Sequence, residues 1–448
     1  MHYTEGEHAI ALMLQEMGLR STDELFKDVP ANVRAPLQLP KGLSEMEVRR
    51  RQMRTLAKNS HFTDLPHFLG AGMYHHYVPP EVRAIASRGE FLTSYTPYQS
   101  EASQGMLQAM FEFQSMVCLL TEMDAANISM YDGATALAEA ALMASRITAR
   151  DEVLIPRHTL ADRRGTLLAY AEGPGLRVVE YDYDPRTGQA DLADVERKLS
   201  AKTAAVVLEN PNFFGMFEER AAQVAEMAHA KGALSVVGVN PISLGLVKGP
   251  GSYGADIVIG EGQALGQSPS FGGPALGLFA CRKEHLRMMP GRIVGQTQDK
   301  QGQRAFCLTL QTREQHIRRE RATSNICTNE GLNALMATLY LAMVGGKGLK
   351  RIARLNASRA KHLAERIGAL PGYKVPFEGY TFNEFVVQCP RPVAQVNASL
   401  LQRQQLWGGL DLEAQFPELG HAMLLCVTEL HPQEALDGLV QGLSEVRR

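Results

Sequence analysis

Short apolar runs alternate with amphipathic stretches through the middle of this chain. The runs lie at Val153–Ile155, Ala204–Leu208 and Leu234–Val239. Between them, stretches such as Ala221–Ala230 carry apolar residues at helical spacing. Strands that are apolar on both faces are typical of a parallel sheet covered by helices. The pattern therefore predicts a large α/β domain over residues 67–324.

A different pattern precedes this domain. Apolar residues fall at helical spacing from His8 to Arg20. Ser21 with Glu24, and Ser44 with Glu47, have the spacing of capping boxes, so each pair predicts the start of a further helix. Residues 1–66 are expected to form a helical N-terminal arm.

The C-terminal part mixes long helices with two short strands. Helical periodicity runs over Gly331–Val344 and again over Arg351–Ile367. The expected strands are Glu384–Gln388 and Leu424–Thr428, and an amphipathic helix follows Pro432. This pattern therefore predicts a smaller α+β domain over residues 325–448.

Composition narrows the class of function. The 448 residues are 45% hydrophobic and carry a formal charge of -2, which gives no general attraction to nucleic acid or to anionic membranes. The N-terminus has no leader-like pattern, and no apolar run is expected to reach membrane-spanning length. Six single cysteines lack metal-ligand spacing, so we expect no metal site and interpret them as reduced packing residues of a cytoplasmic protein.

The first candidate for chemistry is the loop at residues 91–105. It places two tyrosines, several hydroxyls and a carboxylate around Pro97, just before a helix expected to begin near Gln104. Such a loop can wall a pocket around a flat ring or a small carboxylate. A polar turn with Tyr95 and Tyr98 as packing residues fits the same composition, and both interpretations stay open.

Three further candidates are a helix start, a strand end and a glycine-rich loop. Asp132 precedes an alanine-rich helix whose N-terminus could bind a phosphate, but a carboxylate at the N-cap position favours the structural interpretation. Asn240, beside Pro241, is neutral and is interpreted as a turn residue that once faced a ligand or still faces a partner. The glycines of Gly260–Gly266 do not follow a dinucleotide-binding pattern, and we expect them to permit close backbone approach.

The last candidate is the charged segment 313–328. Glu314 and Arg318 have the spacing of a helical ion pair, and Arg313 and Arg321 are expected on a solvated face. The hydroxyls and amide of Thr323–Asn325 are suited to recognising a phosphate or a carboxylate, including one on a neighbouring chain.

Taken together, several motifs in order resemble one family over nearly the whole chain. That family is the first (α) subunit of two-chain glycine dehydrogenase (decarboxylating), the P-protein of the glycine cleavage system. The matching motifs are Tyr95-Thr96-Pro97-Tyr98-Gln99, Met130–Ala140, Pro211–Gly215, Gly260–Gln263, Arg313–Arg319 and Ala322–Thr328. The resemblance implies a fold-type I pyridoxal-phosphate transferase architecture.

One residue that such enzymes need is missing here. The strand and loop Gly254–Gly266 resemble the segment that carries the cofactor lysine, but Ala264 stands in the loop, and Lys248 and Lys283 lie too far along the chain. The family often has an acidic residue where this chain has Asn240. The resemblance thus implies that no cofactor is bound covalently here and that pyridoxal phosphate lies on the second (β) subunit.

The resemblance also implies a reaction and partners. The complex would decarboxylate glycine and pass the aminomethyl group to the lipoyl arm of the H-protein, as an α2β2 heterotetramer. The site residues expected in a shared cleft are Tyr95, Thr96, Tyr98, Gln99 and Glu101. Those expected near the partner's cofactor phosphate are Thr323, Ser324 and Asn325. Two alternatives stay open: a scaffold that only stabilises its partner, and a self-sufficient pyridoxal-phosphate enzyme that uses another lysine.

Overall fold

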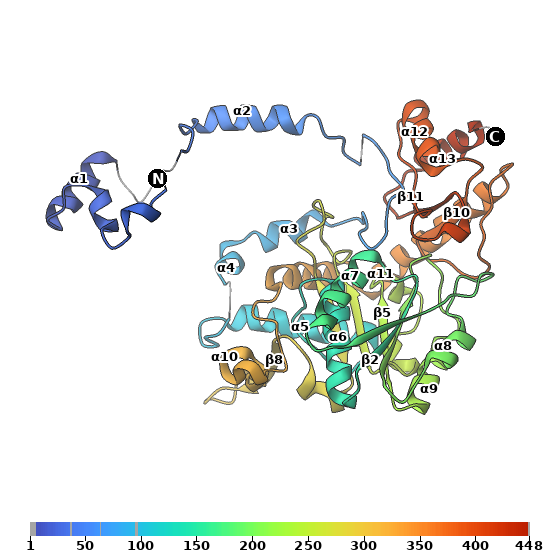
Figure 1. Ribbon diagram of the computed structural model, residues 1–448, viewed down its shortest axis with the longest axis horizontal. Helices are drawn as coiled ribbons and strands as arrows, with labels where there is room; N and C mark the ends of the chain where they lie inside the picture. The colour runs from blue at the N-terminus through green and yellow to red at the C-terminus, as the bar shows by residue number, and fades with distance from the viewer. Residues whose placement is uncertain (1–5, 36–37, 63, 95–96, 447–448) are drawn as a thin grey trace. The chain divides into compact units, whose positions relative to one another are not determined.

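The computed structural model describes the chain except for residues 1–5, 36–37, 63, 95–96 and 447–448. It divides into two compact units, Met1–Ser60 and His61–Arg448. Figure 1 colours both units along the chain. The domain boundaries predicted after residues 66 and 324 are not tested by this division and stay predictions.

The first unit is helical, and none of its described residues is buried. Its elements are α1 (Glu7–Glu16), η1 (Thr22–Phe26), η2 (Ala31–Val33) and α2 (Glu45–Leu56). Ser44 and Glu47 form the predicted capping box of α2. The box predicted at Ser21 is wrong, because the Glu24 amide donates to the Ser21 backbone carbonyl at 3.3 Å in a tight 3₁₀ turn.

The second unit is built on a seven-stranded sheet in the order β1-β7-β6-β5-β4-β2-β3. The strands from β3 to β6 run parallel, whereas β7 pairs antiparallel with both β6 and β1. The predicted strands are therefore confirmed. Their bounds are β1 (Ala125–Ala126), β2 (Glu152–Pro156), β3 (Arg177–Tyr181), β4 (Thr203–Asn210), β5 (Leu234–Val239), β6 (Ile257–Glu261) and β7 (Gly277–Cys281).

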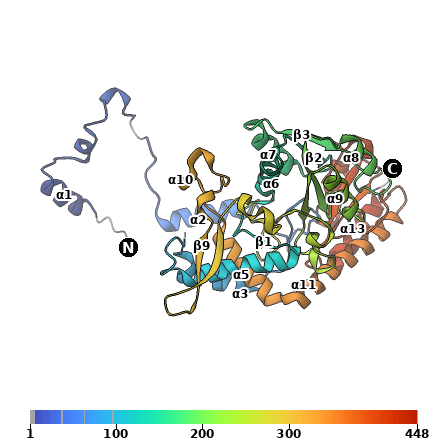
Figure 2. The same ribbon diagram turned by 90° about the horizontal axis from the view of Figure 1, so that it is seen from below.

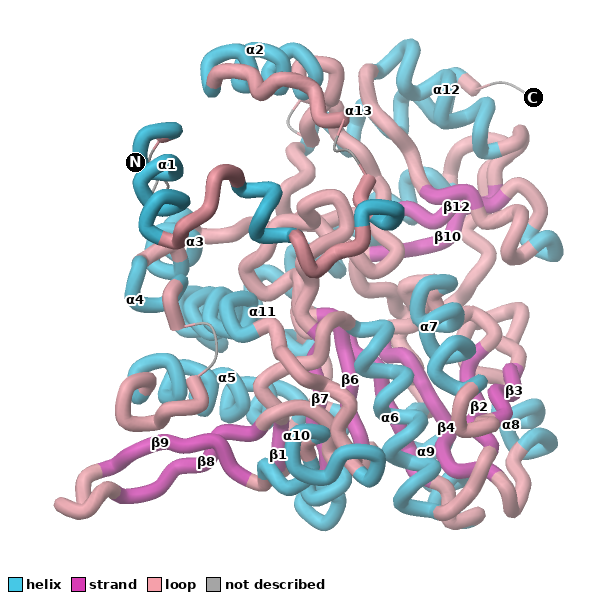
Figure 3. Tube along the Cα trace, turned by 60° about the vertical axis from the view of Figure 1, so that its left-hand side comes forward, coloured by secondary structure: helices cyan, strands magenta, loops and turns pink. Residues whose placement is uncertain are grey.

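Helices cover both faces of this sheet (Figure 3). Alternate side chains of β4 point to opposite faces: Ala205 and Val207 pack toward α6 and α7, whereas Val206 and Leu208 pack toward α8 and α9. Each fully buried aliphatic side chain of this kind contributes about 1.5–3 kcal/mol. The helices are α3 (Pro80–Ala86), α4 (Gly89–Leu92), α5 (Gln104–Thr121), α6 (Gly133–Thr148), α7 (Ala161–Glu172), α8 (Leu192–Lys198), α9 (Ala221–Ala230) and α10 (Gln315–Arg318).

A long helix, α11 (Gly331–Gly368), lies in the chain between the seven-stranded sheet and a second, three-stranded sheet. Gly345 has a φ of 57° inside it, so the two helices predicted here are halves of one interrupted helix. Among the described residues, α11 alone is long and apolar enough to cross a membrane, which corrects the expectation that no run reaches that length. Its buried residues pack against α5 and α3, as in a core helix.

The C-terminal part forms a three-stranded antiparallel sheet in the order β10-β12-β11. Its elements are β10 (Glu384–Gln388), α12 (Val393–Gln404), β11 (Leu410–Asp411), β12 (Ala422–Cys426) and α13 (Gln433–Glu445). A separate ribbon, β8 (Ile293–Gln298) with β9 (Arg304–Thr309), lies beside α5 (Figure 2). The six cysteines are free as expected, but Cys327 is exposed rather than packed.

Candidate functional site

Three strand ends and two helix starts converge at one edge of the large sheet. β4, β5 and β6 end there at Asn210, Val239 and Glu261, and α6 begins at Gly133. α7 begins at the same edge and contributes Arg163. The carboxyl edge of a parallel sheet is where α/β proteins bind ligands. We refer to this group of residues as the sheet-edge corner.

A buried ion pair occupies the centre of this corner. Arg163 donates through Nη1 to Glu209 Oε1 at 2.8 Å, and the two side chains are only 10% and 5% exposed. Burial opposes the charge on Arg163, but the carboxylate of Glu209 raises the pKa of the guanidinium above its ordinary value. Each charge stabilises the other, so removing either side chain would leave the remaining charge buried and unpaired.

A second carboxylate closes the N-terminus of α6. Glu261 Oε2 accepts from the Gly133 amide at 2.9 Å, and its Oε1 accepts from the Gln263 and Leu276 amides at 2.8 and 3.0 Å. Burial raises the pKa of Glu261, although these three donors and Arg163 oppose that rise. The Gly133 amide at the helix start, a group that suits a phosphate, is thus already bound to a side chain of the same protein.

The predicted cap at the same helix is confirmed. Asp132 Oδ1 accepts from the Thr135 amide at 2.7 Å, and the Thr135 hydroxyl completes the box with the Asp132 amide at 3.1 Å. The structural interpretation of this helix start is therefore the one that the geometry supports.

A residue of the C-terminal sheet also lines the sheet-edge corner. Glu384 of β10 accepts from the Ala71 amide at 2.6 Å and from the Tyr74 hydroxyl at 2.7 Å. Burial raises the pKa of Glu384 to about 7, which the two hydrogen bonds and Arg163 only partly offset. Burial likewise raises the pKa of Tyr74 well above its ordinary value, so its hydroxyl stays protonated.

The space that remains does not fit pyridoxal phosphate. The cavity measures about 30 Å³, which holds one or two water molecules, whereas small-molecule pockets span roughly 300–1,000 Å³. The charges of the lining also disfavour a phosphate, because it has only one guanidinium, that of Arg163, beside the three carboxyl groups of Glu209, Glu261 and Glu384.

The amine and the acid that the cofactor needs are also missing from this corner. Ala264 is 3% exposed, and no lysine lines the cavity. Asn240 ends β5 as predicted: its Oδ1 accepts from the Ile242 amide at 3.0 Å, while its Nδ2 is buried without a partner among the described residues. Lys248 and Lys283 are exposed elsewhere.

The tyrosine loop is only partly described, because Tyr95 and Thr96 lie outside the described residues. Tyr98 is 56% exposed, and its ring lies 4.7 Å from the guanidinium carbon of Arg292. Its hydroxyl also accepts a hydrogen bond from Arg292. Gln99 and Glu101 are exposed on the same loop. Tyr98 therefore lies on the surface, where a partner or a ligand can reach it, instead of packing in the core.

The segment Thr323–Asn325 lies beside the same stretch of chain. Ser324 is buried, and its hydroxyl accepts from the Gly291 amide at 2.9 Å. The Thr323 hydroxyl is buried without a partner among the described residues, and Asn325 donates to Glu139 of α6 at 3.5 Å. The two sets of predicted site residues thus meet at residues 291 and 292. Their contact with a partner's phosphate stays a prediction.

Two expectations for the charged segment are wrong. Glu314 is buried and lies 3.6 Å from Arg292 Nε and from His316 Nδ1, not beside Arg318, because α10 is a single turn. Arg313 is buried as well, and its guanidinium donates to the carbonyls of Leu310, Met289 and Gly291. Only Arg321 lies on the solvated face as expected.

Sequence reasoning missed most of the polar residues that build these sites. Arg163, Glu209 and Glu384 stand in ordinary helix and strand patterns, and nothing local marks them as a cluster. Arg292 follows a proline and a glycine and precedes a strand, which gives no signal of a buried guanidinium. Glu261 lies within a quoted motif, yet its contact with Gly133 spans 128 residues.

Comparison with known proteins agrees with this architecture. Residues 1–443 match the family model described as glycine cleavage system P-protein. The chain is 50% identical over 436 residues to the probable glycine dehydrogenase (decarboxylating) subunit 1 of Desulforamulus reducens, with 97% of each chain covered. The corresponding protein of Desulfitobacterium hafniense is 48% identical over 437 residues, again with 97% of each covered.

A solved structure of similar fold covers the whole chain. It is the crystal structure of a glycine decarboxylase (P-protein) of the glycine cleavage system in inhibitor-bound form, with a TM-score of 0.92, 41% identity and 100% coverage of both chains. The predicted fold class, a fold-type I pyridoxal-phosphate transferase architecture, is therefore confirmed.

Proposed function

Because this chain belongs to the glycine cleavage system P-protein family, as a relative of glycine dehydrogenase (decarboxylating) subunit 1, we propose that it is the subunit that does not carry the cofactor. Pyridoxal phosphate supplies the electron sink for decarboxylation in enzymes of this fold. In this proposal the cofactor and its lysine lie on a second subunit, and glycine is decarboxylated only by the complex of the two.

The closed sheet-edge corner is the observation that carries this proposal. A cofactor site needs an amine, an anion-binding helix start and room for a ring. Here the loop residue is Ala264, the Gly133 and Thr135 amides at the start of α6 are bound to Glu261 and Asp132, and about 30 Å³ remains. A self-sufficient pyridoxal-phosphate enzyme would have to open this corner and use a lysine from outside it.

The contribution of this chain to the reaction is proposed to come from the surface around Tyr98. Arg292 is only 3% exposed but lies under the exposed Tyr98 ring, and Glu314 is close enough to hold it in place. A held guanidinium with a phenol above it can orient a carboxylate or a phosphate that the partner presents. Thr323, Ser324 and Asn325 border the same place and would approach the partner's cofactor phosphate.

The finer parts of the proposal concern partners. The aminomethyl group that remains after decarboxylation would pass to the lipoyl arm of the H-protein. We propose an α2β2 assembly in the cytoplasm. A chain that only stabilises its partner is the competing possibility, and it makes a different prediction for surface substitutions.

The test is turnover of the reconstituted two-subunit complex with Tyr98→Phe. This change removes the hydroxyl that bonds to Arg292 and leaves the ring. Loss of a hydrogen bond to a charged group costs about 1.5–3 kcal/mol, so we expect release of labelled carbon dioxide from glycine to fall about 10- to 100-fold. Tyr380→Phe, at a tyrosine that is 70% exposed, is the matched control and should leave turnover unchanged.

Thermal stability is measured on the same variants. Reduced turnover of the Tyr98→Phe complex, with an unchanged melting temperature and intact association, supports a role in the active centre. Wild-type turnover would remove Tyr98 from that centre, and a loss of association with the partner would support the scaffold alternative.

A further inference from the structure

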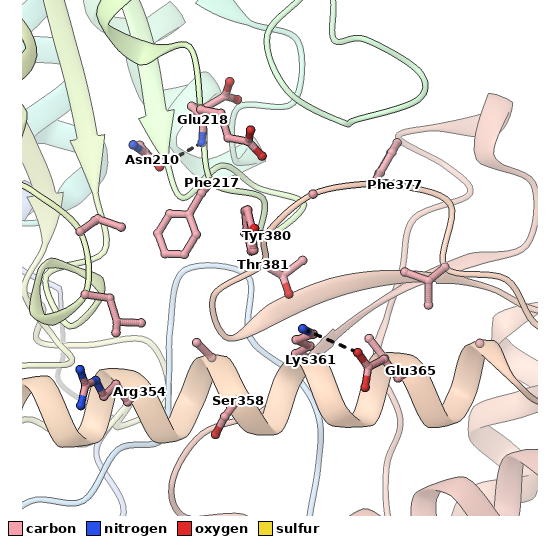
Figure 4. Close-up of a pocket in the computed structure, with 18 of the residues that line it drawn as sticks. Asn210, Phe217, Glu218, Arg354, Ser358, Lys361, Glu365, Phe377, Tyr380 and Thr381 are labelled. Atoms are coloured by element: carbon pink, nitrogen blue, oxygen red, sulfur yellow. Dashed lines mark hydrogen bonds and ion pairs between the residues drawn. The ribbon is translucent and has the colours of Figure 1, made fainter.

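A second, much larger cavity lies on the opposite face of the large sheet from α6 and α7. It measures about 1080 Å³ and is separate from the small cavity of the sheet-edge corner, although Asn210 at the end of β4 belongs to the corner and also lines the larger cavity. Its walls are the second half of α11, the segment 373–381, residues 217–219 and the loop 246–248. Figure 4 shows α11 along one side of this space, with aromatic side chains on the other side. No step of the proposed reaction uses it.

The two walls differ in the size of their side chains. On α11 the lining positions recur at three- and four-residue spacing, and Ala357, Ala364 and Gly368 are small enough to leave the space open. Phe217, Phe377 and Tyr380 line the facing side (Figure 4). The labelled helix face from Arg354 to Glu365 spans eleven residue steps, or about 16 Å along the axis. The result is an elongated slot with mostly apolar walls.

Positive charge without a partner surrounds this slot. Lys248, Arg354 and Lys374 line it and are exposed, and none of them has a carboxylate within 4.0 Å in the described part of the chain. Lys361 is different, since its ammonium lies 3.9 Å from Glu365. The exposed Glu219 also lines the slot and has no ion pair among the described residues. Three unpaired cations against this one unpaired carboxylate, beside an apolar slot, favour an anion that also has an apolar part.

The polar groups at the inner end are satisfied within the protein. Asn210 accepts from the Glu218 amide at 3.2 Å and donates to the Tyr253 hydroxyl at 3.5 Å. Glu218 is itself buried and hydrogen-bonded to Asn212 and to the Ala190 amide. A ligand therefore has little to gain from polar contacts at the inner end, so its charged group belongs with the cations at the rim.

We propose that this cavity binds a small molecule with an elongated apolar body and one anionic head group, a carboxylate or a phosphate monoester. The apolar body lies between α11 and the aromatic wall, and the head group lies near Arg354 and Lys248. This site is separate from the proposed active centre and does not depend on it.

The test is calorimetric titration of the full-length chain, alone and with its second subunit, using decanoate and decyl phosphate. Decanol and decyltrimethylammonium have the same chain without the negative charge. We expect one site per chain and binding of the better anion at least about tenfold tighter than decanol. Whichever anion binds more tightly identifies the preferred head group.

Two substitutions locate the binding. Arg354→Glu should weaken anion binding about tenfold or more. The matched control Lys350→Glu makes the same charge change on an exposed position of α11 that does not line the cavity, and it should have little effect. Ala357→Trp should fill the slot and abolish binding. If that variant misfolds, Tyr380→Ala, at an exposed wall residue, should weaken binding instead.

Several results would overturn the proposal. These are equal binding of decanol and decanoate, equal effects of the two charge reversals on α11, and no binding of either anion. Loss of binding when the second subunit is added would also overturn it, because the slot would then be part of a protein interface.

Discussion

The ion pair in the sheet-edge corner gives the sharpest prediction for stability. Replacing Arg163 by Met leaves the buried Glu209 carboxylate without its partner, and replacing Glu209 by Leu leaves the guanidinium without its own. The pair is formed at 2.8 Å by side chains that are 10% and 5% exposed. Water can therefore do little to replace the missing charge in either single variant.

The magnitude follows from that burial. Breaking a buried ion pair from one side costs about 3–5 kcal/mol, whereas replacing both partners by apolar residues of similar volume is often nearly neutral. We expect each single variant to lose about 3–5 kcal/mol of unfolding free energy, and the double variant to stay within about 1–2 kcal/mol of the wild type. The coupling energy of the cycle should be about 3 kcal/mol or more.

The assay is urea denaturation of all four proteins, followed by far-ultraviolet circular dichroism. Two results would refute the reasoning. Additive losses in the double variant would mean that the two side chains act independently. Losses below about 1 kcal/mol in both single variants would mean that solvent reaches the corner, so that it is not closed in the way described.

Three further predictions concern single side chains. Ser324→Ala removes the acceptor of the buried Gly291 amide and should cost about 1–3 kcal/mol in urea denaturation; a neutral result would show that the amide finds another acceptor. Asp132→Ala removes the cap that binds the Thr135 amide and should cost about 0.5–2 kcal/mol in the same assay, and no loss would contradict the capping role. The raised pKa of Glu384, about 7 against an ordinary 4.5, means that the native state holds a proton that the unfolded state releases between these values, so its contribution to stability falls as pH rises. Glu384→Gln should therefore gain roughly 2–3 kcal/mol relative to wild type between pH 5 and pH 8 in urea melts, and a difference that does not change with pH would contradict the burial of this charge.

Local pattern predicted the strands and helices well. The apolar runs that became β4 and β5 are buried on both faces, and such runs have few other stable arrangements. The capping box of Ser44 was correct because its partners are three residues apart. Ser21 and Glu24 have the same spacing, but in a 3₁₀ turn the Glu24 amide donates to the Ser21 backbone carbonyl instead of to its side chain. Propensity alone cannot distinguish the two cases.

The site was predicted less well, because its contacts are long-range. Glu261 lies within a motif that resembles the family, but the reason for a carboxylate there appears only when Gly133 is seen 2.9 Å away. Arg292 meets Tyr98 across 194 residues. The spacing of Glu314 and Arg318 predicts a helical ion pair, but Glu314 is buried and lies beside Arg292 instead. Such pairs are set by topology, which spacing along the chain does not encode.

The residues around the closed corner are also part of the fold. The strands of the large sheet and α6 belong to the core of the domain. At the edge of the sheet, Ala264 provides no amine, and the side chains around Arg163 leave only about 30 Å³. The polar side chains there satisfy one another and so stabilise the corner.

The central claim is that this chain cannot hold pyridoxal phosphate and needs a second subunit for turnover. The most direct test is to add excess pyridoxal phosphate to the purified chain, reduce with borohydride, and map any modified lysine, while release of labelled carbon dioxide from glycine is followed with and without the second subunit. The account predicts no absorbance band of lysine-linked cofactor, no stoichiometric modification of a lysine, and turnover only in the two-subunit mixture. A yellow chain with one labelled lysine that decarboxylates glycine alone would contradict it.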